Sequence, residues 1–362
     1  MDNSEQLGII KKDLHAIVSQ ANNWLMLIGS GTSMAMDVTL GMGALAEHLV
    51  ASISDSSESW GTIRDKLKAG ENLEKALTDV NLPSTLQNKI AEETFKFVSK
   101  KDIDLRDDLL TGEKCWTSGS LIKSFYQSLN ATSPILPVIT PNYDMLIEYA
   151  CSVEGIPYLT GYHGGITKKL NWKKSREYCS TVSKVNQGRT PKILSQGCPR
   201  VELMKVHGSI NLFRDSNNAF IENTLWASKY PEGYFPIIAP PGDSKTQDTL
   251  TFHDELFSEM KPAIMRSTAF MIVGYGFNDP HIHGAILQQV REKDCPLIVL
   301  TRDPSAKLDA LIESSANTWV ITGKEGDDSG TRINNRNLTA PCEVDGVDLW
   351  NSETFTKQIL GN

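Results

Sequence analysis

The sequence predicts an α/β fold built on a doubly wound parallel sheet with a helical insertion subdomain. Several short apolar runs end in glycine or polar residues, which is typical of strands that a parallel sheet buries on both faces. Helical patterns separate most of these runs, as β-α alternation requires. One stretch, 54–133, interrupts the alternation with helical periodicity and almost no β-branched runs. Together these three observations indicate a Rossmann-like architecture.

The first 53 residues predict a helix, a strand, a glycine turn and a second helix. Apolar residues between Ile10 and Val18 recur at three- and four-residue spacing, which indicates an amphipathic helix. The run Trp24–Ile28 is apolar throughout and predicts a buried strand. It leads directly into Gly29-Ser30-Gly31-Thr32-Ser33, and the periodic stretch 42–53 predicts the helix that leaves this turn.

After the helical insertion the alternation of strands and helices resumes. Further strands are expected at 135–140, near 204–207, and at 270–274, 296–300 and 318–322, with helices around 252–265, 281–291 and 305–311. Within this region 163–200 is expected to be a loop insertion. Residues 1–322 are therefore expected to form one domain around the sheet, and the polar stretch 323–362 a C-terminal loop and tail.

The composition excludes several classes of protein. Hydrophobic residues make up 40% of the 362 residues, which is enough for a sizeable core. The formal charge of -8 gives no global reason to expect nucleic-acid binding. A local basic run at 168–176, interleaved with Trp172, is most often a solvated loop, and it leaves open only a weak or indirect contact with nucleic acid or with a partner.

The six cysteines are scattered and include no Cys-x-x-Cys pair, which argues against a zinc knuckle and against a disulfide framework. His281 and His283 are two apart, so on a helix they point in different directions and cannot make a metal pair. No run approaches the roughly 18 apolar residues of a membrane span. The start of the chain is polar where a signal peptide needs a basic and then apolar segment. We expect a cytoplasmic protein without a membrane segment or a metal.

The glycine turn is suited to hold a pyrophosphate. Gly29 and Gly31 leave no side chain between the backbone amides and the ligand, and a following helix presents its positive N-terminal end to the phosphates. Thr32 and Ser33 add hydroxyl donors. Taken alone, the motif is also compatible with a merely tight turn, since Met34 occupies the position of a third fingerprint glycine.

Two polar motifs follow other predicted strands at the same edge of the sheet. In Thr140-Pro141-Asn142-Tyr143-Asp144, Asn142 is suited to bind a ribose hydroxyl or a water, and Asp144 to accept from a carboxamide; the alternative is an Asx turn. His207 is suited to accept a proton near neutral pH, and the alternative is a buried structural histidine. With the glycine turn, these residues provide the parts that bind a dinucleotide and cleave its glycosidic bond.

These motifs resemble those of the sirtuin-like, NAD-hydrolysing proteins of bacterial anti-phage defence. Residues 29–33 match the family's Gly-Ala-Gly-Ala-Ser loop, residues 140–144 its Thr-x-Asn-x-Asp motif, 207–209 its His-Gly, and 274–282 its late Gly-Tyr-Gly-Phe-x-Asp-Pro segment. The resemblance implies that Asn142 and His207 are the catalytic pair. It further implies a set of residues that bind NAD: Gly29, Ser30, Gly31, Thr32, Ser33, Asp144, Gly274, Tyr275, Gly276, Asp279, Thr301 and Arg302. For Arg302 the alternative is a surface ion pair.

The chain departs from the deacetylases in two places. Their Gly-Ile-Pro-Asp-Phe-Arg segment is missing, because residues 34–43 contain no arginine, and their four-cysteine zinc module is missing, because Cys179 and Cys198 stand alone. Both departures favour hydrolysis of NAD itself. We therefore expect an NAD glycohydrolase that needs no metal and that releases nicotinamide and ADP-ribose, with NAD as its substrate.

The resemblance also implies an NAD-depleting effector of antiviral defence, controlled by homo-oligomerisation or by a partner such as a HerA-type ATPase or an Argonaute-type protein. Two other functions remain open at this stage. One is a non-catalytic module that senses NAD or ADP-ribose, and the other is an NAD-dependent protein deacylase.

Overall fold

The computed structural model describes residues 3–54, 57–77, 80–187, 190–239, 247–325 and 329–361. Its strands are β1 (Trp24–Ile28), β2 (Ile135–Thr140), β3 (Tyr158–Leu159), β4 (Tyr162–Gly164), β5 (Lys168–Leu170), β6 (Ser180–Gln187), β7 (Thr190–Gly197), β8 (Arg200–Lys205), β9 (Gly208–Arg214), β10 (Phe220–Glu222), β11 (Phe235–Ile238), β12 (Ala269–Val273), β13 (Leu297–Thr301), β14 (Thr318–Gly323), β15 (Gly330–Asn334) and β16 (Cys342–Asp345).

Its α-helices are α1 (Asn3–Gln20), α2 (Gly31–Met34), α3 (Met42–Ser52), α4 (Glu58–Lys68), α5 (Leu73–Leu77), α6 (Ser84–Thr111), α7 (Thr117–Gln127), α8 (Leu146–Val153), α9 (Trp172–Tyr178), α10 (Gln247–Arg266), α11 (Pro280–Lys293), α12 (Ala306–Ile312) and α13 (Ser352–Phe355). Short 3₁₀ turns cover Val38–Leu40 (η1) and Thr224–Ala227 (η2), and a π-helical turn η3 covers Thr356–Leu360.

The central sheet has the strand order β16-β15-β14-β13-β12-β1-β2-β8-β3 in the described part of the chain. The strands from β14 to β3 are parallel, and β15 and β16 add antiparallel pairs at one edge. The order reverses at β1, since β2, β8 and β3 lie on one side of it and β12, β13 and β14 on the other. In such sheets ligands bind outside the carboxyl ends of the strands at the point of reversal. The predicted α/β, Rossmann-like class is confirmed.

Helices cover both faces of this sheet, and the strand β1 shows why its sequence is apolar throughout. Met26 and Ile28 pack into a core that also contains residues of α1, α7 and α8. Leu25 and Leu27 point to the opposite face, into a core with residues of α10, α11 and α12. Because successive side chains of a strand alternate between faces, both sets must be apolar. The bounds predicted for β1 and β2 are confirmed without change.

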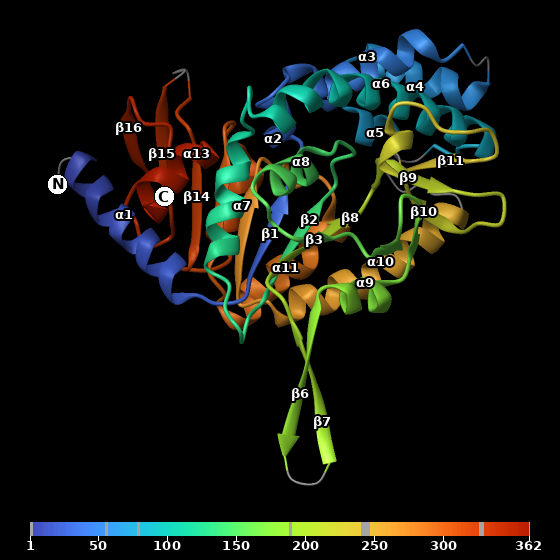
Figure 1. Ribbon diagram of the computed structural model, residues 1–362. Helices are drawn as coiled ribbons and strands as arrows, with labels where there is room; N and C mark the ends of the chain where they lie inside the picture. The colour runs from blue at the N-terminus through green and yellow to red at the C-terminus, as the bar shows by residue number, and fades with distance from the viewer. Residues whose placement is uncertain are drawn as a thin grey trace.

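The helical insertion encloses a small core of its own. The buried members of this cluster come from α3, α4, α5 and the first half of α6, between Leu45 and Ile90. In Figure 1 these helices lie at the top right of the molecule. The later helix α7 instead buries Leu121, Ile122 and Phe125 in the core beneath the sheet. The predicted stretch 54–133 is helical, but its two ends serve two different cores.

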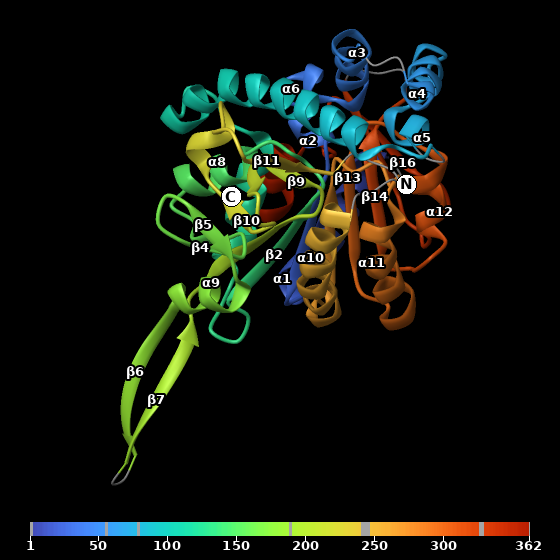
Figure 2. The ribbon, with the colours of Figure 1, turned by 90° about the vertical axis from the view of Figure 1, so that its right-hand side faces the viewer.

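Two segments expected to be loops contain regular structure. Within 163–200 the chain forms β4, β5, α9 and the hairpin β6-β7, which extends away from the rest of the molecule in Figures 1 and 2. A second sheet, β11-β9-β10-β5-β4, includes part of this segment. The prediction of a loop there is wrong: β4 and β5 have three residues each and are too short to show a periodic pattern, and the eight-residue strands β6 and β7 are mostly polar without alternating apolar residues.

The C-terminal prediction is also wrong. Residues 330–334 and 342–345 form β15 and β16, which extend the central sheet, and Leu349, Phe355 and Ile359 are buried in its core. Edge strands pair through backbone hydrogen bonds, which a polar, Asn-rich sequence does not reveal. One further strand differs slightly: β8 ends at Lys205, so His207 lies in the turn that follows it.

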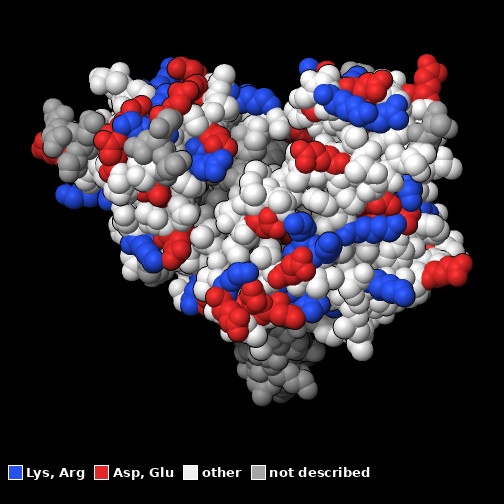
Figure 3. All heavy atoms as spheres, turned by 90° about the horizontal axis from the view of Figure 1, so that it is seen from above, with Lys and Arg blue, Asp and Glu red and all other residues white. Residues whose placement is uncertain are grey.

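Charges of both signs are intermixed on the face that Figure 3 shows. Acidic side chains from elsewhere in the chain partly neutralise the basic run 168–176. Lys168 pairs with Glu222, and Arg176 pairs with Glu202 at 2.9 Å and stacks over Trp172. Lys169, Lys173 and Lys174 are exposed. Within the described ranges, no helix combines the length and the apolar character that crossing a membrane requires.

Candidate functional site

A cavity at the carboxyl edge of the central sheet, where the strand order reverses, is lined by the predicted pair Asn142 and His207, and for that reason we call it the main cavity. It has a volume of about 150 Å³. Its floor is built from the turns that follow β1, β2, β8 and β12, and its roof from η1, α3, α5 and α6. The described residues that line it are Ser30, Ser33, Leu40, Met42, Leu45, Asn72, Leu73, Glu74, Phe97, Val98, Pro141, Asn142, Tyr143, Asp144, His207, Tyr275, Gly276, Asn278 and Asp279.

Two glycine-containing turns pack backbone to backbone beneath this cavity. A Cβ atom on Gly29 would lie 2.5 Å from the carbonyl oxygen of Gly274, and one on Gly31 would lie 2.9 Å from the Gly274 Cα. Gly274 itself has φ +59°, and its Cβ would approach the Thr32 amide nitrogen to 2.7 Å. The glycines are therefore required by the close contact between the ends of β1 and β12.

The glycine turn differs from its prediction in one respect. The helix that follows it, α2, is a single turn of four residues, and the chain bends through η1 before α3 begins. The amides of Gly31, Thr32 and Ser33 donate to carbonyl oxygens of Gly274, Gly29 and Ser30 at 2.8–3.1 Å. A one-turn helix carries little of the dipole that a long helix supplies. Ser30 and Ser33 are the residues of this turn that line the cavity.

Asn142 is held in place by a hydrogen-bonded network. Its Nδ2 donates to the carbonyl oxygen of Gly29 at 3.1 Å and to Ser33 Oγ at 3.0 Å, and Ser33 Oγ donates to Asp144 Oδ2 at 2.7 Å. These contacts leave Oδ1 of Asn142 as a buried acceptor to which no group in the described part of the protein donates. Buried acceptors without a donor are uncommon in folded proteins. The amide is therefore oriented so that it can accept from a ligand or from water.

His207 and Asp279, from the turns after β8 and β12, form a pair on the floor of the main cavity. His207 Nε2 lies 3.2 Å from Asp279 Oδ2. Burial raises the pKa of Asp279, but the hydrogen bond and the charge of His207 outweigh it, so the pKa falls to about 2. Asp279 therefore remains ionised at neutral pH and orients the imidazole. With the Nε2 proton directed at this carboxylate, Nδ1 is the basic nitrogen of the ring.

The backbone around this pair is tightly constrained. Gly208 has φ +85°, and a Cβ there would lie 1.8 Å from the carbonyl oxygen of Ile237. The carbonyl oxygen of His207 accepts from the Ala239 amide at 2.8 Å. In the turn after β12, Phe277 is a buried residue with a positive φ of 54°. Such conformations cost energy for residues other than glycine, and they cluster at functional sites.

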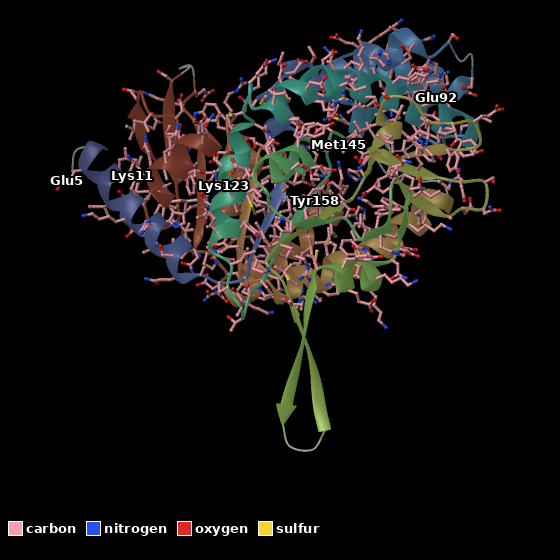
Figure 4. The ribbon with its side chains drawn as sticks, viewed as in Figure 1. Glu5, Lys11, Glu92, Lys123, Met145 and Tyr158 are labelled. Carbon is pink, nitrogen blue, oxygen red and sulfur yellow. The ribbon has the colours of Figure 1, made fainter. Side chains whose placement is uncertain are left out.

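A buried polar network supports the motif 140–144 from behind. Lys205 Nζ donates to the carbonyl oxygen of Asp144 at 2.5 Å and to Glu148 Oε1 at 2.8 Å. Asp102 of α6 accepts from the Met145 amide at 2.8 Å and from the Tyr149 hydroxyl at 2.5 Å. Met145 is labelled in Figure 4, between α8 and the helices above. Burial raises the pKa of Asp102 to about 7, against the opposing effect of these hydrogen bonds.

A second cavity, of about 220 Å³, lies on the other side of the glycine turn. Gly31, Thr32 and Gly274 line it, together with Thr301 and Arg302 at the carboxyl end of β13. The C-terminal segment closes it with Trp350, Asn351 and Ser352. Arg302 is largely exposed, and its Nε lies 3.0 Å from Asp303 Oδ1, as expected for a surface ion pair.

The structure thus distributes the residues predicted from the sequence over two neighbouring cavities. Six line the main cavity with the predicted pair Asn142 and His207, namely Ser30, Ser33, Asp144, Tyr275, Gly276 and Asp279. Five line the second, namely Gly31, Thr32, Gly274, Thr301 and Arg302. Gly29 instead lies against the backbone of Gly274 and Tyr275.

Sequence reasoning missed Glu74 and Phe97 in the main cavity and Trp350 in the second. They come from the helical insertion and the C-terminal tail, where no motif marks them. Among the described residues, no group of three or more His, Cys, Asp or Glu side chains is arranged to hold a metal ion. Independence from metal stays a prediction.

Comparisons with known proteins bear on the family. A family model described as a SIR2-like domain matches residues 137–321, which include the motifs around Asn142, His207 and Asp279 but not the glycine turn. No curated protein sequence matches the chain. Similar solved structures include a mutant Sir2 homologue in complex with ADP ribose, with 12% identity, a TM-score of 0.42, and coverage of 84% of this chain and 90% of that one.

Two other structures are similar to the same degree. Sir2Tm bound to a propionylated peptide shows 13% identity and a TM-score of 0.39, with 85% of this chain and 91% of that one covered. Sir2Af2 bound to a myristoylated histone peptide shows 12% identity and a TM-score of 0.39, with 84% and 89% covered.

Proposed function

The chain belongs to the SIR2-like domain family, and on that premise we propose that it is an NAD glycohydrolase, which cleaves NAD to nicotinamide and ADP-ribose. The observation that carries the proposal is the convergence, in one cavity, of an oriented amide with a buried acceptor atom and an imidazole paired with a carboxylate. These are the groups that position a ribose and a water and that remove a proton.

Asn142 and His207 act directly in the proposed reaction. Asn142 Oδ1 accepts from a ribose hydroxyl or from the attacking water, and His207 Nδ1 accepts the proton that this water loses. The water oxygen bonds to the anomeric carbon, the bond from that carbon to the ring nitrogen breaks, and its electron pair leaves with neutral nicotinamide. Asp279 stabilises the imidazolium that forms, and Asp144 accepts from the carboxamide of the leaving group.

The two cavities fit the two halves of a dinucleotide. The main cavity takes the nicotinamide ribose, with apolar Leu73, Phe97 and Val98 above the ring. The second cavity takes the adenosine, with Thr301 and Arg302 near its ribose. The glycine turn lies between them, where the pyrophosphate passes, and its residues Gly31 and Thr32 border the second cavity while Ser30 and Ser33 border the first.

The test is release of nicotinamide from NAD by the purified protein, followed by chromatography, together with deacylation of an acylated lysine peptide. We expect nicotinamide and ADP-ribose in equal amounts without peptide, and loss of both products in Asn142→Ala. If nicotinamide is released only when the peptide is deacylated, the protein is a deacylase. Tight binding of ADP-ribose without any turnover would favour a sensing module.

We also propose that the activity is restrained by homo-oligomerisation or by a partner, because an unrestrained enzyme of this kind would exhaust the cofactor of its host. We propose that the protein is an NAD-depleting effector of anti-phage defence whose activity is restrained in this way, with a HerA-type ATPase or an Argonaute-type protein as the kind of partner. The test is cellular NAD in cells that express the chain alone or with its genomic neighbours. Constant depletion by the chain alone, at all concentrations, contradicts the proposed restraint.

A further inference from the structure

The helical insertion contributes a carboxylate to the wall of the main cavity. The helix α5 begins after Asn72, whose Oδ1 accepts from the Lys75 amide at 2.7 Å and fixes the first turn. Leu73 and Leu77 lie on the face of α5 that is buried in the core of the insertion. Glu74 follows Leu73 on this short helix and lines the cavity together with Asn142 and His207.

The Glu74 carboxyl group interacts electrostatically with groups across the cavity. Burial and the charge of Asp279 raise its pKa, while the charges of His207 and Lys307 and a hydrogen bond with Asn278 act in the opposite direction. Asn278 Oδ1 in turn accepts from Lys307 Nζ at 2.5 Å. This chain of contacts joins the insertion to the turn after β12, so the carboxylate of Glu74 has a defined place opposite the floor of the cavity.

The cavity as a whole is acidic. Glu74 on the roof and Asp144 and Asp279 on the floor line it, and no lysine or arginine is present among the described lining residues. In a partly buried site such charges act over several ångströms with less screening than in water. The site therefore favours a ligand that brings positive charge. The nicotinamide ring of NAD⁺ carries a positive charge, whereas the ring of NADH is neutral.

We propose that Glu74 is a specificity-determining residue that selects the oxidised, cationic nicotinamide ring over the reduced, neutral one. This inference rests on the proposed function in that it places the nicotinamide in the main cavity. It goes further because it assigns a role in substrate selection to the helical insertion. The insertion is then part of the active site and not only a cover.

The experiment measures binding rather than turnover. Isothermal titration calorimetry compares the carbocyclic analogue of NAD⁺, whose glycosidic bond is not hydrolysed, with NADH. Wild-type protein should bind the cationic analogue more tightly. Glu74→Gln, which removes the charge and keeps the size, should reduce the ratio of the two affinities at least about threefold, as expected for one unit charge about 6 Å away in a water-like dielectric.

A matched control is available in the same insertion. Glu71 lies outside the main cavity and pairs with Lys75 at 3.8 Å. Glu71→Gln removes the same charge and should leave the ratio unchanged. Affinity for ADP-ribose, which has no nicotinamide ring, should not fall in either variant. If Glu74→Gln does not fold, Glu74→Asp, which draws the charge back from the ring, should lower the ratio in the same direction.

The inference and the proposed function fail in different ways. An unchanged ratio in a folded Glu74 variant overturns the inference, even if NAD is hydrolysed. Equal affinity of the wild-type protein for the cationic analogue and NADH, or binding of neither, overturns it as well. Selective binding of the analogue without any release of nicotinamide from NAD supports the inference and contradicts the glycohydrolase.

Discussion

Replacing Asp279 with asparagine tests the pair that it forms with His207. Asp279 Oδ2 lies 3.2 Å from His207 Nε2, and the pKa of the carboxyl group falls to about 2 from its ordinary 3.8. This difference corresponds to about 2 kcal/mol of net interaction with its surroundings, in which the effect of burial is outweighed first by His207 and then by His281. In the proposed mechanism this carboxylate holds the imidazole in the orientation in which it accepts a proton. Its loss should lower kcat/KM at least about thirtyfold.

The asparagine variant leaves the fold intact for a specific reason. Asp279 Oδ1 also accepts from the His281 amide at 2.8 Å and caps the start of α11. Asparagine is an equally good cap, so the variant should still fold, with a melting temperature lowered only by the loss of the ionic interaction. Asp345→Asn, which removes a surface charge paired with Lys324, is the matched control.

The assay is initial-rate release of nicotinamide at several NAD concentrations between pH 5 and 9. A folded Asp279→Asn variant with kcat/KM within threefold of the wild type would refute the role of the pair.

The remaining predictions concern catalysis, the glycine turn, a buried acid and metals. Asn142→Ala and His207→Ala should fold and lose about two orders of magnitude in turnover; nicotinamide release near the wild-type rate by either sinks that assignment. Gly31→Val should weaken binding of ADP-ribose and also lower the melting temperature, since its Cβ meets the Gly274 backbone at 2.9 Å; unchanged calorimetric affinity would contradict this. The pKa of Asp102 is raised to about 7, so this side chain binds a proton more tightly in the folded protein than in the unfolded chain. Its contribution to stability is therefore full below about pH 4 and is lost as the pH rises to about 7. The free energy of unfolding of the wild type, measured in urea, should fall by up to about 4 kcal/mol relative to that of Asp102→Asn over this pH range. A difference between the two proteins that does not change with pH would contradict the raised pKa. Activity should survive EDTA, and a complete loss that added metal restores would contradict the mechanism.

Much of the site was predictable from the sequence because each motif follows a strand. The apolar runs before Gly29 and Asn142 mark buried parallel strands, and the carboxyl ends of parallel strands meet at one edge. This reasoning places Asn142, Asp144 and His207 together without any knowledge of the helices. The cavity has the same residues in its floor.

The roof of the site was not predictable in the same way. Glu74 and Phe97 reach the cavity because α5 and α6 pack over the sheet, and that packing is set by a core of buried residues spread from Leu45 to Ile90. Trp350 reaches the second cavity because the C-terminal segment folds back against the core. Contacts between residues so distant in the chain leave no local pattern.

The sequence by itself determined the strands of the parallel core and the motifs at their carboxyl ends, because alternation of buried faces and the order of strand and turn are local properties. Only the tertiary structure decided that Asp279 pairs with His207, and that the backbone of Gly274 requires glycine at 29 and 31. It also decided that the helical insertion supplies a third carboxylate, that of Glu74, to the main cavity. It also showed that the apparent loop near Arg332 is the strand β15, which pairs with β14 on one side and β16 on the other. The physical reason is that long-range packing and backbone pairing depend on which surfaces meet, and that information is not contained in any single segment.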